Sequence, residues 1–203
     1  DAVAALSRGE SDMAGFHVPL GEFESSAMDR YRRWLDPKTH QLIHLAVRAQ
    51  GLFVNPGNPL NIRSVPDLAR SDVRFVNRQA GSGTRMLLEL MMHSKDISPA
   101  QINGFENTEF THSAVAAFIA SGMADVGFGV QTAAERFKLD FIPLVQERYF
   151  FAVNAEAMNQ PHMHQMISVL RSSGFRHVVN QLPGYDAAHT GEILTLNEAF
   201  GPP

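Results

Sequence analysis

A short run of small and polar residues, placed between a predicted strand and a predicted helix, has the chemistry of an anion site. The run is Gln79-Ala-Gly-Ser-Gly-Thr-Arg85, and the apolar residues around it predict a strand over 73–78 and a helix over 86–92. The first N–H groups of a helix lack partners within the helix and lie at the positive end of its dipole, so they attract anions. Ser82 and Thr84 add hydroxyl groups, and Arg85 adds a planar cation. The segment therefore predicts that a small anion binds here.

The same residues also have a structural interpretation. Ser82 or Thr84 could serve only as the N-cap of the helix, because a side-chain oxygen there accepts a hydrogen bond from a backbone N–H of the first turn. Arg85 could pair with Glu89, which lies one turn further along the same helix. The segment has neither the lysine of a phosphate loop nor a dinucleotide glycine pattern, so nucleotide binding is not expected.

A second helix start offers similar chemistry. Thr111, His112 and Ser113 open a predicted helix, where one hydroxyl is expected to cap and the remaining N–H groups can meet an anion. His112 could donate a hydrogen bond to an oxyanion, or it could be a hydrogen-bonded structural histidine. Gly127 and Gly129 end a predicted strand, where they suit either a close approach of the backbone to a ligand or packing against a helix.

Other polar residues are weaker candidates. His17 ends a predicted strand and could reach a ligand from another part of the fold, although exposed histidines are common. Arg148 and Tyr149 could close over a ligand, but packing is the simpler interpretation of both. His162 and His164 are too closely spaced to share one face of a helix, so a metal site is not expected.

Composition excludes several classes of protein. The chain has 203 residues and a net charge of −4, and its pI is about 6.1, which argues against a nucleic-acid surface in this segment. The chain lacks cysteine, so it has no disulfides, thiolate metal sites or cysteine nucleophile. No apolar run is long enough to cross a membrane. No cofactor is expected.

Strands and helices alternate along the chain, which predicts an α/β fold with largely parallel sheets. Two long strand segments, residues 42–54 and 145–153, bracket the part that carries the glycine motif. A chain that leaves one lobe and returns to it would need two such crossings, which suggests two lobes joined by a double hinge around a ligand cleft. The predicted elements also include short strands at 141–145 and 148–153, helices at 157–171 and 174–181, and an irregular tail from residue 183.

Several motifs together resemble a known family. In chain order they are Asn77-Arg-Gln-Ala-Gly-Ser-Gly-Thr-Arg85, Thr111-His-Ser-Ala-Val-Ala-Ala117, Ala120-Ser-Gly-Met-Ala-Asp-Val-Gly-Phe-Gly129, and Asp140-Phe-Ile-Pro-Leu144 with Glu147-Arg-Tyr149. The chain resembles periplasmic-binding-protein-like domains of type II, in the branch related to molybdate and tungstate binding proteins. Similar domains occur fused to helix-turn-helix regulators or to molybdopterin-biosynthesis enzymes. The resemblance covers nearly all of the chain.

The resemblance implies a two-lobed type II fold with a double-strand hinge. Lobe 1 would comprise residues 1–50 and 148–203, and lobe 2 residues 51–147. The family pattern also has a strand and a helix before residue 1, so we expect this chain to be a fragment that lacks them. The ligand-binding residues implied by the motifs and the helix starts are Ser82, Gly83, Thr84, Arg85, Thr111, His112, Ser113, Gly127 and His17.

The function implied is that of a sensor or solute-binding domain that closes on a small anion, with molybdate or tungstate as the leading ligands. A fused or partner helix-turn-helix or molybdenum-cofactor domain would read the signal, and a homodimer is one expected assembly. The compartment implied is the cytoplasm, or the periplasm if the domain serves a transporter. An organic carboxylate or phosphate is the alternative ligand.

Two other functions remain as alternatives. Ser82 and His112 could form a hydrolase pair, although the chain has no Gly-x-Ser-x-Gly elbow and no evident carboxylate beside His112. The domain could instead have lost its ligand and serve only as a dimerising scaffold. We therefore expect a binding module rather than an enzyme.

Overall fold

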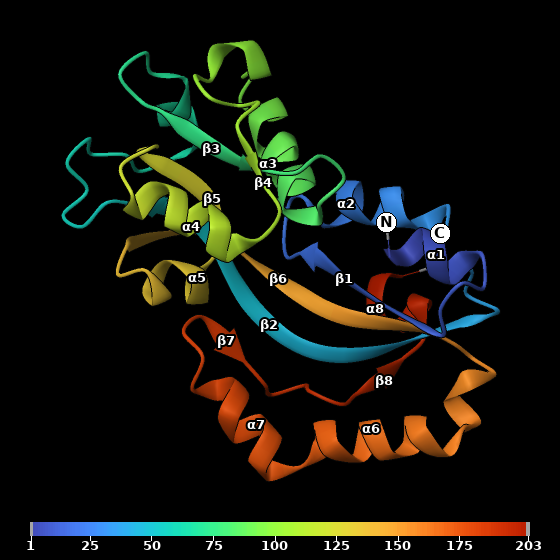
Figure 1. Cartoon of the computed structure of the whole chain (residues 1–203). Coiled ribbons are helices and arrows are strands. Elements are labelled where there is room, and N and C mark those ends of the chain that lie inside the picture. Colours follow the sequence, from blue (N-terminus) through green and yellow to red (C-terminus); the bar gives the residue numbers. More distant parts are fainter. Residues whose placement is uncertain (1, 202–203) are drawn as a thin grey trace. The chain divides into compact units, whose positions relative to one another are not determined.

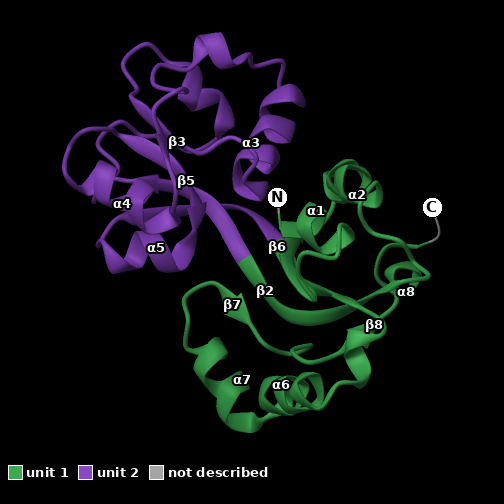
Figure 2. Cartoon of the chain, turned by 45° about the vertical axis from the view of Figure 1, so that its right-hand side comes forward, with its two compact units in different colours: residues 1–48, 147–203 green, residues 49–146 purple. Residues whose placement is uncertain are grey.

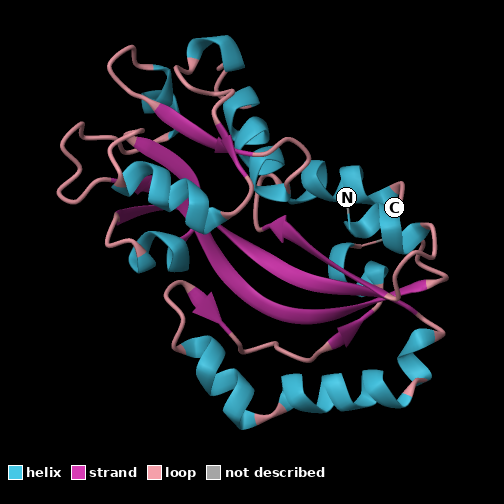
Figure 3. Ribbon diagram, viewed as in Figure 1, coloured by secondary structure: helices cyan, strands magenta, loops and turns pink. Residues whose placement is uncertain are grey.

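The computed structural model describes residues 2–201, and residues 1, 202 and 203, which belong to the predicted first lobe, lie outside the described part. Helices and strands alternate along most of the chain (Figures 1 and 3). The strands are β1 Met13–Pro19, β2 His40–Val54, β3 Phe75–Arg78, β4 Thr108–Glu109, β5 Val126–Val130, β6 Asp140–Asn154, β7 Tyr185–Asp186 and β8 Ile193–Leu194. The α-helices are α1 Ala2–Ser7, α2 Glu24–Arg32, α3 Gly83–His93, α4 His112–Ala120, α5 Gln131–Arg136, α6 Pro161–Arg171, α7 Ser173–Asn180 and α8 Leu196–Phe200. Short 3-10 helices lie at Val65–Ala69, Pro99–Gln101 and Ala157–Asn159.

The chain forms two compact units, which we call unit 1 and unit 2 (Figure 2). Unit 1 comprises residues 1–48 and 147–203, and unit 2 comprises residues 49–146. Strands β2 and β6 are neighbours in the sheet, and each of them carries the chain from one unit to the other. Unit 2 is therefore inserted into unit 1 through two strands.

Unit 1 is built on antiparallel pairs. Strand β1 pairs with β6 from Met13 opposite Val153 to Pro19 opposite Glu147. Helix α6 covers this unit with a cluster of apolar side chains, to which β2 contributes Ile43 and β6 contributes Val153. The prediction of a largely parallel sheet is thus wrong for this unit. Alternation of strands and helices could not reveal it, because β1 and β6 lie far apart in the sequence.

Residues 185–200 contain two short strands and a helix, so the irregular tail predicted from residue 183 is wrong for this part. Strands β7 and β8 both pair antiparallel with β2, and helix α8 follows them. Two-residue strands carry too little apolar periodicity to be recognised in a sequence. The start of α8 did carry a signal, because Thr195 and Glu198 form a reciprocal capping box.

Strand β6 is continuous, whereas two strands were predicted at 141–145 and 148–153. The polar residues Gln146, Glu147 and Arg148 interrupt the apolar pattern and suggested a break. In the structure Glu147 is completely buried, and it is paired with Arg48 on β2. The strand thus continues through a buried ion pair. A pattern of apolar residues cannot indicate such a position.

Unit 2 has the parallel arrangement that was predicted. Strand β5 pairs with β3 in parallel, β3 pairs with β4 in parallel, and β2 joins β5 antiparallel on the other side. Buried apolar residues of β5, α4 and α5 form its core, including Val115, Ile119 and Ala134.

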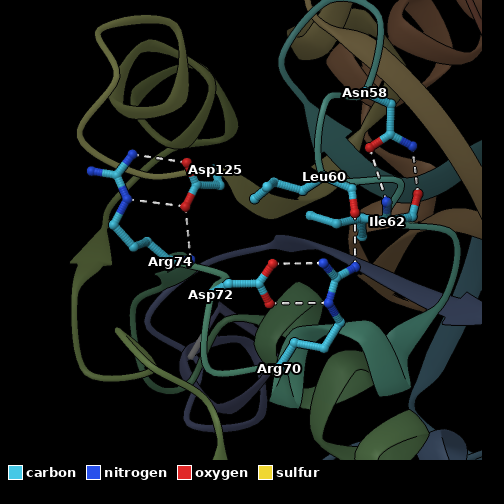
Figure 4. A network of polar contacts seen from close by, with 7 residues as sticks. All are labelled: Asn58, Leu60, Ile62, Arg70, Asp72, Arg74 and Asp125. Atoms are coloured by element: carbon cyan, nitrogen blue, oxygen red, sulfur yellow. Dashed lines mark hydrogen bonds and ion pairs between the residues drawn. The ribbon is translucent and has the colours of Figure 1, made fainter.

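Polar contacts fix the loops of unit 2 at the end remote from the strand carboxyl ends (Figure 4). The Asn58 side chain both accepts from Ile62 N and donates to Ile62 O, which closes the turn after β2. Arg70 forms two hydrogen bonds with Asp72 and a third with Leu60 O. Arg74 similarly pairs with Asp125, which ties the segment before β3 to the segment before β5.

Candidate functional site

Three parallel strands of unit 2 end at the same edge of the sheet. Strand β3 ends at Arg78 and β4 at Glu109, which are register partners, and β5 lies on the other side of β3. Each strand is followed by a helix, so α3, α4 and α5 all begin near this edge. The carboxyl ends of parallel strands are the usual place for a ligand in open α/β sheets.

The start of α3 combines a cap with unused donors. Ser82 is the N-cap, and its Oγ accepts a hydrogen bond of 3.2 Å from Arg85 N, which confirms the capping interpretation for Ser82. The N–H groups of Gly83 and Thr84 make no hydrogen bond to the described part of the protein. The Thr84 side chain is buried, and it belongs to the packing of this helix. The available donors here are therefore mainly backbone groups.

Arg85 has protein partners of its own. Its Nε donates to Glu89 Oε1 at 3.0 Å, as the alternative interpretation predicted, and its guanidinium lies 4.6 Å from the centre of the Phe105 ring. The side chain is only 12% exposed. The carboxylate of Glu89 therefore balances the positive charge of Arg85, which weakens the attraction of Arg85 for an anionic ligand.

Arg78 is a cation at this edge that the sequence reasoning missed. It ends β3, and its Nη2 donates at 3.0 Å to the carbonyl oxygen of Phe110, which precedes the start of α4. Arg78 thus links the strand end to the second helix start. The available signal was its position as the last residue of the predicted strand, immediately before the glycine motif.

The start of α4 repeats the arrangement at α3. Thr111 is the N-cap, and its Oγ1 accepts a hydrogen bond of 3.0 Å from Ala114 N. The N–H of Ser113 makes no hydrogen bond to residues 2–201. One capping hydroxyl and an available backbone donor were both predicted for this helix start, and both are present.

The two glycines at the end of β5 are explained by packing. A Cβ on Gly129 would lie 2.5 Å from Nδ1 of His112 and 2.7 Å from the Phe53 ring. A Cβ on Gly127 would lie 2.5 Å from Cγ1 of Val115. Both glycines therefore let α4 and its neighbours pack closely on the sheet. His112 lies against the strand at Gly129.

His17 belongs to a separate group of polar side chains in unit 1, together with Arg48, Glu147, Tyr149 and Tyr185. Glu147 Oε2 lies 2.5 Å from Nδ1 of His17, and its Oε1 accepts at 2.5 Å from Nε of Arg48. The Arg48 guanidinium lies 4.6 Å from the Tyr149 ring, and its Nη1 lies 3.4 Å from the Tyr185 hydroxyl. We call these five residues the Glu147 cluster. Sequence reasoning selected His17 as a ligand-binding residue, named Glu147 only as part of a family motif and did not select Arg48.

The electrostatics of the Glu147 cluster favour its charged form. Burial opposes ionisation of Glu147, but the charges and hydrogen bonds of His17 and Arg48 outweigh it and lower the pKa of Glu147 to about 2. Burial also disfavours the charged form of Arg48, yet Glu147 and Tyr185 raise its pKa above the ordinary value. Glu147 is therefore a carboxylate at neutral pH.

The remaining candidates have packing or surface roles. Nη2 of Arg148 lies 2.5 Å from Glu24 Oε1 and donates to Ala199 O, and the guanidinium also contacts the Phe150 and Phe200 rings. This arrangement agrees with the packing interpretation of Arg148. His162 lines a cavity of unit 1 of about 510 Å³. No group of three or more His, Cys, Asp or Glu residues in the described chain is placed to hold a metal ion, and no described helix is long and apolar enough to span a membrane.

Comparison with protein families identifies the fold. The sequence profile of the PBP superfamily domain matches residues 1–171. The uncharacterised protein YvgK of Bacillus subtilis is 33% identical over 189 residues, which are 93% of this chain and 61% of that protein. The chain thus spans less than two thirds of this relative.

Solved structures support the same fold. The regulatory domain of MetR, a LysR family regulator from N. meningitidis, superimposes with a TM-score of 0.63 at 15% identity, covering 92% of this chain and 79% of that one. An ABC-type phosphate transport receptor from Vibrio cholerae gives a TM-score of 0.59 at 16% identity, covering 91% and 83%. These likenesses confirm the predicted α/β fold of the type II periplasmic-binding-protein class.

Proposed function

We propose that this chain, which belongs to the PBP superfamily, binds a small anion at the carboxyl ends of the parallel strands in unit 2 and performs no chemistry on it. The observation that carries the proposal is the pair of capped helix starts at this edge. Gly83, Thr84 and Ser113 each have a backbone N–H without a protein acceptor in the described chain. Such groups, at the positive ends of two helix dipoles, bind anions without a metal or a cofactor.

A phosphate or a carboxylate group is the ligand chemistry we favour. The phosphate receptor among the structural neighbours supports an anionic ligand of this size, although its identity to the chain is low. Molybdate and tungstate fit the same donors, but none of the comparisons described above supports them. We therefore rank phosphate and small carboxylates first and keep molybdate and tungstate as members of the test panel.

A hydrolase pair of Ser82 and His112 finds little support. Ser82 Oγ accepts a hydrogen bond from Arg85 N as the helix cap, which is a structural use of its lone pair. His112 packs against Gly129 at the end of β5. Both side chains therefore have roles that a binding domain explains without turnover.

We further propose that another domain or protein reads the ligand-bound state. The Bacillus relative is longer than the matched segment, and one structural neighbour is the regulatory domain of a LysR family regulator. A helix-turn-helix or molybdenum-cofactor partner, and a homodimer, both fit this role. A cytoplasmic setting follows for a regulator and a periplasmic setting for a transport receptor.

The first test measures thermal unfolding of the chain with phosphate, sulfate, molybdate, tungstate and small carboxylates. A ligand present at 100 times its dissociation constant should add about 2.7 kcal/mol to the free energy of unfolding. A stabilising anion supports the proposal and names the ligand class. Turnover of a chromogenic ester that is lost in Ser82→Ala would overturn it in favour of a hydrolase.

A proline substitution tests the backbone donors directly. Gly83 is the first residue of α3, where proline is tolerated, so Gly83→Pro removes one N–H and keeps the helix. Ser173→Pro is the matched control, because Ser173 is the first residue of α7 and also follows a serine cap in extended conformation. We expect Gly83→Pro to weaken anion binding about tenfold, which corresponds to one lost hydrogen bond to a charged group, and Ser173→Pro to leave it unchanged. Equal anion affinity in both variants would contradict a site at α3.

A further inference from the structure

A cavity of about 510 Å³ lies in unit 1, where β1 begins beside the end of β6 (Figure 1). The first pair of these strands is Met13 with Val153, and the residues next to that pair in the sequence, Asp12 and Asn154, line the cavity. Residues before β2 and at the start of α6 complete the lining, all of which belongs to unit 1. Sites for small molecules usually have volumes of about 300–1,000 Å³, so this cavity is large enough for a ligand.

Backbone hydrogen bonds fix the segments around the cavity. Ala155 N donates to Thr39 O at 2.8 Å, which ties the end of β6 to the residue before β2. Asn154 N donates to Asp12 O at 3.2 Å, which ties the same end to the residue before β1. The three segments that carry the charged side chains of the lining are therefore held together. A site that is formed in advance loses less entropy when a ligand binds.

Three charged side chains line the cavity, and they carry both signs. Asp12 and Glu156 are acidic, and Lys38 is basic. None of the three forms an ion pair or a side-chain hydrogen bond within residues 2–201. Single exposed charges are common on protein surfaces and need no partner. Here, however, opposite charges line one cavity without pairing with each other, so both signs remain available to a ligand.

Uncharged polar side chains complete the lining. Asn154, Gln160 and His162 make no side-chain hydrogen bond to the described part of the chain. The two amides can each donate and accept, so they can contact either an ammonium or a carboxylate group. Among the described residues of the lining, none has a large apolar side chain, so the cavity suits a hydrophilic molecule.

We propose that this cavity binds a small molecule with two cationic groups and one carboxylate, as in a basic amino acid. Asp12 and Glu156 accept hydrogen bonds from the cationic groups, and Lys38 donates to the carboxylate. The balance of charge supports this class of ligand, because two negative groups and one positive group of the lining are complemented by two positive groups and one negative group. An amino dicarboxylate such as glutamate has the opposite balance, and its unpaired like charge disfavours binding.

The cavity site is independent of the proposed anion site. The two sites share no residue, because the cavity belongs to unit 1 and the starts of α3 and α4 belong to unit 2. Each site can therefore be tested, and can fail, without the other.

Calorimetric titration of the chain compares L-lysine, cadaverine, L-norleucine and L-glutamate as ligands. Cadaverine is lysine without its carboxylate, and norleucine is lysine without its side-chain ammonium group. Because ion pairs at open sites contribute modestly, we expect cadaverine and norleucine to bind about fivefold more weakly than lysine. Glutamate should show no detectable binding.

Substitutions that remove one charge at a time locate the site. Asp12→Asn and Glu156→Gln should each weaken the binding of lysine and of cadaverine about fivefold. Lys38→Gln should weaken the binding of lysine about fivefold but should not weaken that of cadaverine, because cadaverine has no carboxylate and is repelled by the Lys38 ammonium.

Matched controls separate the cavity from the net charge of the chain. Glu22→Gln and Lys95→Gln remove the same charges from exposed residues outside the cavity. Both variants should bind lysine within about twofold of the unaltered chain, because salt screens distant charges. All of the substituted residues are exposed, so the variants should fold, and thermal unfolding checks this.

A preference for lysine over cadaverine that disappears in Lys38→Gln supports the inference. Absence of lysine and cadaverine binding at millimolar concentration overturns it, and so does binding of glutamate as tight as that of lysine. If lysine binds but Asp12→Asn and Glu156→Gln leave its affinity unchanged, the ligand lies elsewhere and the inference is wrong. The anion panel decides the proposed function separately from all of these results.

Discussion

The two units position their polar groups in different ways. In unit 2, the starts of α3 and α4 combine a capping hydroxyl with backbone N–H groups, those of Gly83, Thr84 and Ser113. In unit 1, the side chains of Arg48 and His17 lie against the buried carboxylate of Glu147. The polar groups of unit 2 are thus positioned by residues that are close in the sequence, whereas those of unit 1 come from three strands that are far apart in it.

The largest effect expected is on the stability of unit 1. Glu147→Ala leaves Arg48 buried without its partner, and it should reduce the free energy of unfolding by about 3–5 kcal/mol. Glu89→Ala in unit 2 breaks the ion pair with Arg85 at a more exposed position, and should cost less than about 1 kcal/mol. Urea unfolding of both variants measures the difference. Equal losses would show that the two ion pairs do not differ in their contribution to stability.

A second effect depends on pH and also arises in unit 1. Burial, aided by the charges of His189 and Arg148, lowers the pKa of His44 from 6.5 to about 4. Between pH 6.5 and pH 4, His44 is protonated in the unfolded chain and neutral in the folded chain. The free energy of unfolding therefore falls as the pH decreases through this range, by on the order of 2 kcal/mol. Above pH 6.5 this residue contributes no dependence on pH.

Chemical denaturation at pH 7 and pH 5 tests this expectation, with His44→Gln as the variant. The variant should lose less stability than the unaltered chain between the two pH values. A steeper loss in the variant would contradict the assignment to His44.

A third effect sharpens the account of unit 2. Gly129→Ala places a Cβ 2.5 Å from His112 and 2.7 Å from the Phe53 ring, so it should destabilise the chain by about 1–3 kcal/mol. Gly174→Ala, inside helix α7 with no atom within 4 Å of the added Cβ, should stabilise it by about 0.5–1 kcal/mol. Thermal unfolding of both variants gives the sign. A neutral Gly129→Ala would show that the glycine is not required for packing.

The smallest effect separates capping from ligand binding. Ser82→Ala and Ser172→Ala each remove a cap whose Oγ accepts a hydrogen bond of 3.2 Å, and each should cost about 1 kcal/mol in stability. Only Ser82→Ala should also change the anion affinity, because its helix start lies at the proposed site. Anion titrations of both variants check this difference. Weaker anion binding in both variants would show that the lower stability, and not the position of Ser82, causes the change.

Much of the fold could be predicted from short stretches of the sequence. The glycine motif, the caps at Ser82 and Thr111 and the strand before the motif were all recognisable, because each depends on residues within one turn or one strand. The pairing of Arg85 with Glu89 is also local and was anticipated as an alternative. The starts of α3 and α4 could therefore be predicted from the order of residues.

What depends on distant pairing could not be read in this way. Arg48 and Glu147 lie 99 residues apart, and each resembles an ordinary surface charge until the strands meet. The antiparallel partners of β1, and the addition of β7 and β8 to β2, likewise follow from contacts that no local pattern encodes. The ligand-binding roles of the residues selected from the sequence stay predictions.

The insertion of unit 2 through β2 and β6 also determines the order in which the chain can fold as it leaves the ribosome. Both strands of every pair that lies wholly within residues 49–146 have been synthesised before Glu147, whereas Met13 must wait for Val153. Long-range pairing of this kind slows folding, and until β6 has been synthesised Phe16 on β1 lacks the Phe150 ring on which it stacks in the structure. Apolar surface of β1 thus stays accessible to a chaperone until β6 has been synthesised.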